Sequence, residues 1–450
     1  MHFIGIDIGT TSICGIVYNS STHHTASVTL ANESTIVSGT SWEKMQNPEW
    51  IIARVLEIVQ KFELQYGDIK GIGITGQMHG ILYVDNEGKA VSPLYTWQDE
   101  RGNLIYDNNI TYAEFLSDYS GYNFSTGFGL VTHFYNIKNA LLPANAVKIC
   151  TIMDYAVMKL SGRTTPLMDY TNAAGLGFFN IRENKFEISS LTSIGIDASI
   201  LPETGESAAF AGYYNSKIPV YSAIGDNQAS FIGSVRDRGK SIHVTIGTSS
   251  QLSVYSKKLL QLPSLDTRPF PGGGYILVGA ALSGGQSLSV LQSFFDSIIQ
   301  LSSNSATNVA GFYELINAIE YKENGPTALS VTTLFNGSRS NPFDRGSISN
   351  ISTTNFTAAD VILGFIRGIC NEVFNFYNGI PDELKKDKHI LIGSGNALKK
   401  NKLLCKTLER TFNLPVVKSA HDEDAALGAS IAAAVGGKYI QDFDAIMKNG

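Results

Sequence analysis

The sequence predicts an α/β protein built from two domains with related folds. Its 450 residues exceed the roughly 100 to 200 that one domain commonly uses. Helical and strand patterns alternate along the chain, which is typical of α/β layers. A short pattern also recurs about half a chain length later, because Asp7-Ile8-Gly9-Thr10-Thr11-Ser12 resembles Thr245-Ile246-Gly247-Thr248-Ser249-Ser250. This internal repeat indicates a duplicated fold.

Each copy of the repeat lies between two β-rich segments. Residues 3–8 and 13–18 flank the first copy, and residues 241–246 and 252–255 flank the second. We therefore expect two strands joined by a Gly-Thr turn in each half of the chain.

An amphipathic helix is expected at about 48–65, because its apolar residues recur at the spacing of one helix face. Strands are expected at 69–75, 220–224 and 390–392, where β-branched residues are concentrated. The domain boundary is expected near residue 220, which gives domains 1–220 and 221–450.

Polar residues follow these three predicted strands where each of them ends. The segments are Gly76-Gln77-Met78-His79-Gly80, Gly225-Asp226-Asn227-Gln228-Ala229 and Gly393-Ser394-Gly395-Asn396. Ligands of open α/β sheets bind beyond the carboxyl ends of strands. All three segments are therefore candidate binding sites.

The composition excludes several classes of protein. The net charge is −6 and charged residues make up only 16% of the chain, so no excess of Lys and Arg is present to neutralise a nucleic acid. The four cysteines show no Cys-x-x-Cys spacing, which indicates neither zinc nor disulfides. The start lacks the pattern of a signal peptide, and no stretch reaches the roughly 18 apolar residues of a membrane span. We expect a soluble cytoplasmic protein without a nucleic-acid or membrane partner.

The first copy of the repeat has the composition of a phosphate-binding turn. Gly9 lets the backbone approach a phosphate, and the hydroxyls of Thr10 and Thr11 can donate to its oxygens. The carboxylate of Asp7 can hold a hydrated Mg²⁺ alongside. The alternative is an ordinary hairpin in which Asp7 caps its own turn, and the second copy at Gly247 makes that alternative weaker.

Asp226 follows a predicted strand and a glycine. A carboxylate there can take a proton from a substrate hydroxyl that lies within about 2.6–3.2 Å. The alternative is a helix N-cap, with the helix running on through Phe231. Both interpretations stay open, because a residue at a helix start can also be catalytic.

Two further segments contain the residue types of a sugar site. His79 can hydrogen-bond a sugar hydroxyl and Met78 can cover an apolar edge of a carbon chain. The alternative is a structural histidine beside a core methionine. The run Trp97-Gln98-Asp99-Glu100-Arg101 provides either an aromatic ring with polar sugar contacts or a surface ion-pair cluster.

Seven segments, taken in order, resemble the FGGY family of carbohydrate kinases over essentially the whole chain. They are Gly5-Ile6-Asp7-Ile8-Gly9-Thr10-Thr11-Ser12, Gly76-Gln77-Met78-His79-Gly80, Gly225-Asp226-Asn227-Gln228-Ala229, Ile246-Gly247-Thr248-Ser249, Gly364-Phe365-Ile366-Arg367-Gly368-Ile369, Gly393-Ser394-Gly395 and Asp424-Ala425-Ala426-Leu427-Gly428-Ala429. The resemblance implies two duplicated ribonuclease H-like domains around a central cleft, as in actin, hexokinase and heat-shock chaperone ATPases.

The resemblance also implies roles for the matching residues. Asp226 would be the general base that deprotonates the attacking hydroxyl, and Asp7, together with Asp226, would hold Mg²⁺. Nucleotide contacts are implied for Gly9, Thr10, Thr11, Ser12, Gly247, Thr248, Ser249, Gly284, Gly395 and Asn396. Sugar contacts are implied for Gln77, Met78, His79, Asp99, Arg101, Asp226 and Asn227. The first domain would hold the sugar and the second most of the nucleotide.

The activity implied is ATP-dependent phosphorylation of a ketose at its terminal primary hydroxyl. Gln77-Met78-His79 is similar to ketose kinases of the xylulokinase kind, where glycerol kinases place an Arg-Glu pair. Segments 96–101 and 126–129 are more similar to the sedoheptulose kinase branch, which implies sedoheptulose 7-phosphate as the product. A pentulose kinase such as xylulokinase or ribulokinase is the alternative. The expected partners are the ketose, ATP and Mg²⁺, and the low charge content leaves room for a homodimer.

A function of another class is kept as an alternative, because the same fold serves ATPases of the actin and chaperone kind that have no sugar acceptor. The Gly-Gln-Met-His-Gly turn and the Asp226 base argue against it, since a pure ATPase needs neither. A silent sugar sensor would more naturally lack Asp7 or Asp226. Residues 288–345 match no recognised pattern, and no role is predicted for them.

Overall fold

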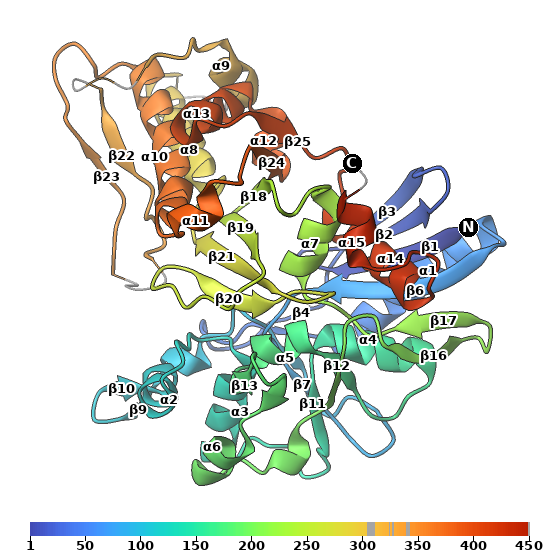
Figure 1. Ribbon diagram of the computed structural model, residues 1–450. Coiled ribbons are helices and arrows are strands. Elements are labelled where there is room, and N and C mark those ends of the chain that lie inside the picture. Colours follow the sequence, from blue (N-terminus) through green and yellow to red (C-terminus); the bar gives the residue numbers. More distant parts are fainter. Residues whose placement is uncertain (304–310, 324, 326–327, 339–342, 449–450) are drawn as a thin grey trace. The chain divides into compact units, whose positions relative to one another are not determined.

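The computed structural model describes residues 1–303, 311–323, 325, 328–338 and 343–448. The chain forms two compact units (Figure 1). Unit 1 consists of Met1–Gly233, Arg268–Gly274 and Glu423–Gly450, and unit 2 of Ser234–Thr267 and Tyr275–Asp422. The first segment of unit 1 ends at Gly233, after the domain boundary that was expected near residue 220. The assignment of the sugar to one half and the nucleotide to the other stays a prediction.

Two six-stranded sheets form the centres of the two units. Sheet 1 contains β16 (Phe210–Tyr214), β17 (Ile218–Tyr221), β6 (Ile69–Gly76), β1 (His2–Ile8), β2 (Ser12–Asn19) and β3 (Thr25–Ala31), in this spatial order. Sheet 2 contains β20 (Asp266–Pro269), β21 (Tyr275–Ala281), β19 (Ser250–Ser256), β18 (Ser241–Ile246), β24 (Ile390–Ser394) and β25 (Val416–Lys418), in this order.

Five strands of each sheet share one topology, and the sixth strands, β16 and β20, lie at opposite edges. In sheet 1, β1 pairs antiparallel with β2 and β2 with β3, whereas β6 runs parallel to β1 and β17 parallel to β6. In sheet 2, β18 pairs antiparallel with β19 and β19 with β21, whereas β24 runs parallel to β18 and β25 parallel to β24. The duplicated fold is therefore confirmed, and the two Gly-Thr turns occupy equivalent places, between β1 and β2 and between β18 and β19.

Helices and short strands surround these sheets. The helices of unit 1 are α1 (Pro48–Gln65), α2 (Tyr112–Ser120), α3 (Gly129–Lys138), α4 (Ile152–Ser161), α5 (Tyr170–Leu176), α6 (Ile188–Ser193), α7 (Asp226–Ser234), α14 (Asp424–Gly436) and α15 (Phe443–Lys448), with the 3₁₀ turns η1 (Arg101–Asn103) and η2 (Ala198–Ile200). Its short strands are β4 (Thr35–Ile36), β5 (Met45–Gln46), β7 (Leu82–Val84), β8 (Leu94–Tyr95), β9 (Ile105–Asp107), β10 (Ile110–Thr111), β11 (Lys148–Cys150), β12 (Leu167–Asp169), β13 (Phe179–Asn180), β14 (Lys185–Phe186) and β15 (Glu203–Gly205). Unit 2 contains α8 (Gln286–Ser303), α9 (Phe312–Ala318), α10 (Ala358–Asn378), α11 (Asp382–Lys385), α12 (Asn396–Lys400), α13 (Lys402–Phe412), β22 (Ser330–Thr332) and β23 (Ser347–Ser349).

The predicted helix at 48–65 is confirmed as α1, and local chemistry explains both its start and its buried face. The Asn47 side chain accepts hydrogen bonds from the backbone N–H groups of Glu49 and Trp50, and a proline occupies the first helical position. Its buried residues recur at helical spacing and belong to the apolar core of unit 1.

The strand expected at 220–224 is shorter than the sequence indicates, because β17 ends at Tyr221. The backbone of the next residues leaves the regular ladder. The Ile224 N–H still donates to the Ile74 carbonyl at 3.1 Å, whereas Ala223 and Gly225 bond to side chains of α5. The pattern of apolar residues contains no information about such hydrogen bonds to side chains, so it could not predict where β17 ends.

Helix α14 packs closely on sheet 1 because glycines in the strands leave room for it. Gly5 on β1 and Gly73 on β6 are paired across the two strands. A Cβ added at Gly5 would lie 1.8 Å from the Ala426 carbonyl oxygen, and one added at Gly73 would lie 2.0 Å from that of Ala429. Backbone-to-backbone approach of this kind tolerates no side chain.

Gly73→Ala is therefore expected to destabilise the protein by roughly 3 kcal/mol or more, since overpacking against backbone cannot be relieved by a rotamer change. Urea unfolding measures the effect. The control is Gly39→Ala, since a Cβ at Gly39 meets nothing within 4 Å and should change stability by less than about 0.5 kcal/mol. Equal stability of the two variants would contradict the close packing of α14.

The remaining apolar residues form two further cores. In unit 2, α8, α10 and α13 pack with buried Leu, Ile and Phe residues on sheet 2. In unit 1, residues from Ile81 to Leu201 form an aromatic-rich cluster that includes parts of α2, α3 and α5. None of the helices in the described ranges has both the length and the apolar character needed to cross a membrane.

Candidate active site

Asp7 lies on β1, opposite Cys14 on β2, next to the first Gly-Thr turn. Its side chain is only partly exposed, and this loss of hydration raises the pKa of the carboxyl to about 7. The neighbouring carboxyls of Asp226 and Glu423 raise this pKa further, because they repel a negative charge. The carboxyls of Asp226 and Glu423 are therefore near enough to Asp7 to act on its charge.

Asp226 is the first residue of α7, and its Oδ1 accepts a hydrogen bond from the Asn227 N–H at 2.7 Å. Burial raises the pKa of Asp226, while the positive charge of Arg268 and backbone hydrogen bonds act in the opposite direction. Asp226 thus stands at the start of a helix, and its carboxyl is near enough to Asp7 to raise the pKa of that residue; its role as the base stays a prediction.

Arg268 is a residue of this site to which sequence reasoning assigned no role. Its side chain is buried, its Nη1 donates to the Asn227 side-chain oxygen, and Nη1 lies 3.8 Å from the Met78 sulfur. The segment Arg268–Gly274 belongs to unit 1, although the residues on both sides of it belong to unit 2. Arg268 is far from Asp226 in sequence and stands in no motif, so no local signal could have revealed it.

Gln77 is held next to the first turn by a short polar network. The Gln77 N–H donates to the Ile8 carbonyl at 2.9 Å, and its side-chain Nε2 donates to the Gln46 oxygen at 2.8 Å. Gln46 in turn donates to the Thr10 carbonyl at 2.9 Å, and the Trp97 indole N–H donates to the Thr10 hydroxyl at 3.0 Å. Gln46 is a second residue that the sequence did not single out.

Met78 and His79 differ in their surroundings. Met78 is buried at 3% exposure within the apolar core of unit 1, which agrees with the core-methionine alternative. His79 is partly exposed and has a left-handed backbone with φ of 73°, which is uncommon for a residue with a side chain. Its Nδ1 lies 2.7 Å from the Gly175 carbonyl, and its ring centroid is 4.6 Å from that of Phe128.

Asp99 and Arg101 form a buried ion pair, with Nε to Oδ1 at 2.6 Å and side-chain exposures of 0% and 1%. The alternative of a surface ion-pair cluster is therefore wrong for these two residues. Arg101 also donates to the Asn136 side-chain oxygen at 2.5 Å, and its guanidinium lies 4.1 Å from the ring centroid of Tyr95. This ion pair holds the loop that carries Trp97. Direct contact of Asp99 or Arg101 with a sugar stays a prediction.

The nucleotide residues expected in unit 2 come together at the carboxyl end of β18. The Gly285 and Gln286 N–H groups donate to the carbonyls of Gly247 and Thr248 at 2.8 and 3.0 Å. A Cβ on Gly284 would lie 2.4 Å from the Ser249 carbonyl oxygen, and one on Gly395 would lie 2.4 Å from that of Ile246.

Helix α8 begins at Gln286 and α12 at Asn396, so two helix N-termini start beside these glycines. Helix N-termini present unpaired N–H groups that favour anions such as phosphates. The remaining predicted nucleotide residues are Gly9, Thr10, Thr11 and Ser12 at the first turn in unit 1, where Asn32 donates to the Gly9 carbonyl at 2.8 Å.

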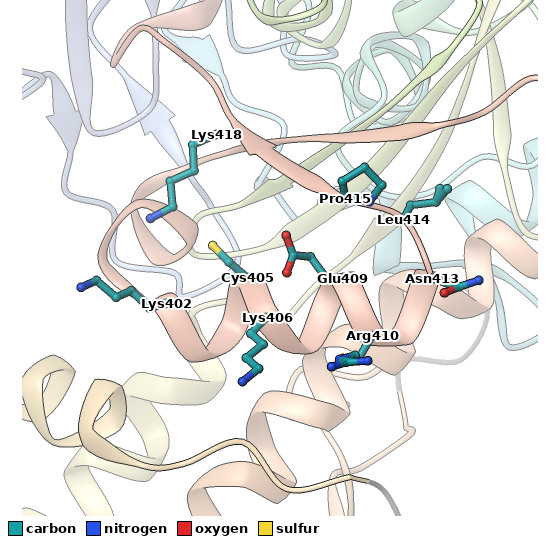
Figure 2. Close-up of a pocket in the computed structure, with 9 residues that line it drawn as sticks. All are labelled: Lys402, Cys405, Lys406, Glu409, Arg410, Asn413, Leu414, Pro415 and Lys418. Carbon is teal, nitrogen blue, oxygen red and sulfur yellow. The ribbon is translucent and has the colours of Figure 1, made fainter.

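A surface hollow of about 630 Å³ lies elsewhere in unit 2, between α13 and the chain leading into β25 (Figure 2). It is lined by Lys402, Cys405, Lys406, Glu409, Arg410, Asn413, Leu414, Pro415 and Lys418. None of these residues was predicted to bind sugar or nucleotide. In Figure 2, Cys405 and Glu409 point toward the strand side, whereas Lys406 and Arg410 point away from it, so the cations do not converge.

Comparisons with known proteins agree with the ordered motifs. The model of the FGGY family of carbohydrate kinases, N-terminal domain, matches residues 2–233, and that of the C-terminal domain matches residues 242–437. The chain is 29% identical to the sedoheptulokinase of Mus musculus, over 95% of this chain and 96% of that protein. It is 26% identical to a xylulose kinase of Staphylococcus epidermidis, over 96% of this chain and 87% of that protein.

Solved structures agree on the fold. The gluconate kinase of Lactobacillus acidophilus superposes with a TM-score of 0.86 at 19% identity, covering 99% of this chain and 91% of that one. The glycerol kinase of Plasmodium falciparum, solved with ADP, superposes with a TM-score of 0.81 at 20% identity, covering 100% of this chain and 93% of that one. With both family models matched over most of its length, the chain belongs to the FGGY family of carbohydrate kinases.

Proposed function

We propose that this carbohydrate kinase transfers the γ-phosphoryl group of ATP to the terminal primary hydroxyl of sedoheptulose, forming sedoheptulose 7-phosphate. The observation that carries the proposal is the position of Asp226 at the start of α7, where its carboxyl is near enough to Asp7 to raise the pKa of that residue. The next residue, Asn227, accepts from Arg268, whose Nη1 lies 3.8 Å from the Met78 sulfur. The similarity to sedoheptulokinases over nearly the whole chain supports the choice of sugar.

Asp226 acts as the general base in this proposal. A carboxylate that lies within hydrogen-bond distance of the attacking hydroxyl can accept its proton as the bond to phosphorus forms. The Arg268 charge favours the ionised form of Asp226, and ionisation is what a base needs. The Asn227 N–H and the Gly225 turn fix the carboxyl at the start of α7.

Mg²⁺ fits the residues around Asp7. Burial is the main cause of the raised pKa of Asp7, and the carboxyls of Asp226 and Glu423 add negative charge that a divalent cation would offset. No group of three or more His, Cys, Asp or Glu ligands occurs among the described residues, but Mg²⁺ is usually held by one or two carboxylates together with phosphates and water. Asp7 and Asp226 would supply those carboxylates, and the bound ion would neutralise charge on the transferred phosphoryl group.

Unit 2 supplies the phosphate contacts for ATP in this proposal. Gly247, Thr248 and Ser249 form a turn that packs against the start of α8, and Gly395 and Asn396 begin α12 beside it. Backbone N–H groups at a glycine-rich turn can approach phosphate oxygens closely. Thr10 and Thr11, at the equivalent turn of unit 1, keep their predicted role as nucleotide contacts.

A pentulose kinase is the second candidate, because several xylulose kinases are 23 to 26% identical over nearly the whole chain. The two candidates share the base, the metal residues and the nucleotide turn. They differ only in the sugar.

His79→Ala is expected to raise the KM for the sugar about tenfold, which is the loss of roughly one hydrogen bond, and to change the KM for ATP by less than about twofold. Steady-state kinetics with each substrate varied measures both values. The control is His79→Asn, which removes the imidazole ring but keeps a residue that tolerates a positive φ. It therefore distinguishes loss of the ring from a change of backbone conformation. Equal losses for sugar and ATP would contradict a role of His79 in sugar binding.

The proposed function is tested by initial rates of ADP formation with Mg²⁺, ATP and each of sedoheptulose, D-xylulose, D-ribulose, L-ribulose, fructose and glycerol. The highest kcat/KM is expected with sedoheptulose. A pentulose with the highest kcat/KM would replace sedoheptulose and leave the ketose kinase in place. ADP formation that no sugar accelerates would favour an ATPase and overturn the proposal.

A further inference from the structure

The segment that carries the proposed base is held from two sides within unit 1. From the sheet side, the Ile224 N–H donates to the Ile74 carbonyl of β6 at 3.1 Å. From the other side, two consecutive side chains at the start of α5 bind the same segment. The Asn172 Nδ2 donates to the Ala223 carbonyl at 2.9 Å, and the Gly225 N–H donates to the Thr171 hydroxyl oxygen at 2.8 Å.

The Thr171 hydroxyl is itself oriented by a third residue. Asp169, the N-cap of α5, accepts hydrogen bonds from the Thr171 N–H at 2.7 Å and from its hydroxyl at 2.5 Å. A hydroxyl has one proton to donate, and donation to Asp169 turns its lone pairs toward the Gly225 N–H. Asp169, Thr171 and Gly225 are all buried, so water cannot replace the missing partner if one of these bonds is lost.

The same short helix also holds the strand end on the sugar side. The Gly175 carbonyl of α5 is the 2.7 Å partner of His79 Nδ1, and a Cβ on Gly175 would lie 3.1 Å from the Met78 methyl group. One turn of α5 thus binds the base segment, and the next turn binds His79. The helix sets the distance between the two.

We propose that Thr171 is a positioning residue for the base Asp226: its hydroxyl, oriented by Asp169, fixes the Gly225 peptide and thereby the direction in which the Asp226 carboxyl leaves the chain. The inference rests on the proposed function, since it assigns the purpose of this contact to phosphoryl transfer. Displacement of a reacting group by about 1 Å can lower a rate about a hundredfold.

The test compares Thr171→Val with Thr171→Ser. Valine keeps the shape of threonine but cannot accept a hydrogen bond from Gly225, whereas serine keeps the hydroxyl. We expect Thr171→Val to lower kcat roughly 10- to 100-fold, with KM for sugar and for ATP changed by less than about twofold. Thr171→Ser is expected to keep kcat within about threefold of the wild type, because the acceptor is retained.

Thr132→Val is the matched control. Thr132 is equally buried, on α3 of the same unit, and its hydroxyl has no hydrogen-bond partner among the described residues. The same chemical change there should leave kcat unchanged. Hydrogen exchange of the peptide that contains Gly225 gives a second readout, and we expect faster exchange in Thr171→Val than in Thr132→Val.

Wild-type kcat in Thr171→Val, or equal losses in the valine and serine variants, would overturn the inference while leaving the kinase assignment intact. Failure of the wild type to phosphorylate any sugar would instead overturn the proposed function. The exchange rate of the Gly225 peptide would then still show whether the Thr171 hydroxyl holds this segment. If Thr171→Val is insoluble, Asn172→Ala removes the neighbouring bond to Ala223. A kcat-selective loss there supports positioning by α5, and an unchanged kcat overturns it.

Discussion

Asp226→Asn is expected to lower kcat for sugar phosphorylation roughly 100- to 10,000-fold, the range that a general base contributes. Asparagine keeps the size of the side chain and can still accept from the Asn227 N–H, but it cannot take the proton of the attacking hydroxyl. ATP binding without Mg²⁺ should change little, because the residues proposed to contact the phosphates do not include Asp226. An enzyme-coupled assay of ADP formation measures kcat, and a separate nucleotide-binding titration measures ATP affinity. Asp226→Ala is expected to give the same result.

Asp154→Asn is the control for this variant. Asp154 is an aspartate of unit 1 whose pKa burial raises to about 7, but its side chain accepts hydrogen bonds from Thr151, the N-cap of α4, and it was not predicted at the site. The same loss of a carboxyl there should preserve turnover. If Asp226→Asn retained wild-type kcat, Asp226 would have no role as the base.

Asp7→Asn is expected to lower kcat/KM for MgATP at least about 100-fold, because stabilisation of transition-state charge by a bound metal ion contributes several kcal/mol. The Mg²⁺ concentration for half-maximal rate should rise, since one of the two proposed carboxylates is lost. The KM for the sugar should stay within about twofold. Rates measured across a Mg²⁺ titration test the prediction.

Two results would contradict the role of Asp7. An unchanged Mg²⁺ dependence with unchanged turnover would remove it from the metal site. A selective rise in the KM for the sugar, with normal Mg²⁺ dependence, would place it on the sugar instead.

Those parts of the fold that rest on local patterns could be predicted from the sequence. The recurrence of Gly9 and Gly247 predicted the duplication, and five strands of each sheet follow the same order. Helix α1 was predictable because its cap and its buried face lie within one continuous stretch. The order of the seven motifs also indicated the family; five of them mark strand ends or turns, and the other two lie in α10 and at the start of α14.

Contacts between distant segments could not be predicted in the same way. The Asp99-Glu100-Arg101 sequence resembles a surface cluster, yet Asp99 and Arg101 pair with each other in the interior beside Tyr95. Arg268 reaches Asn227 from a segment without a motif. Such burial and pairing depend on which elements pack together, and a local pattern does not contain that information.

Residues 288–345, to which the sequence assigned no role, are partly described by the structure. They include most of α8, all of α9 and β22 in unit 2. Residues 304–310, 324, 326–327 and 339–342 lie outside the described residues.

The central claim is that the phosphoryl group passes to a sugar and not to water. Phosphorus NMR of the wild-type reaction with ATP, Mg²⁺ and sedoheptulose tests it most directly. The account predicts one equivalent of a phosphate monoester per ADP, with its phosphorus coupled to the two protons of a terminal CH₂ group, and formation of this product at least about 100-fold more slowly by Asp226→Asn. Inorganic phosphate as the product, formed at the same rate with and without sugar, would contradict it.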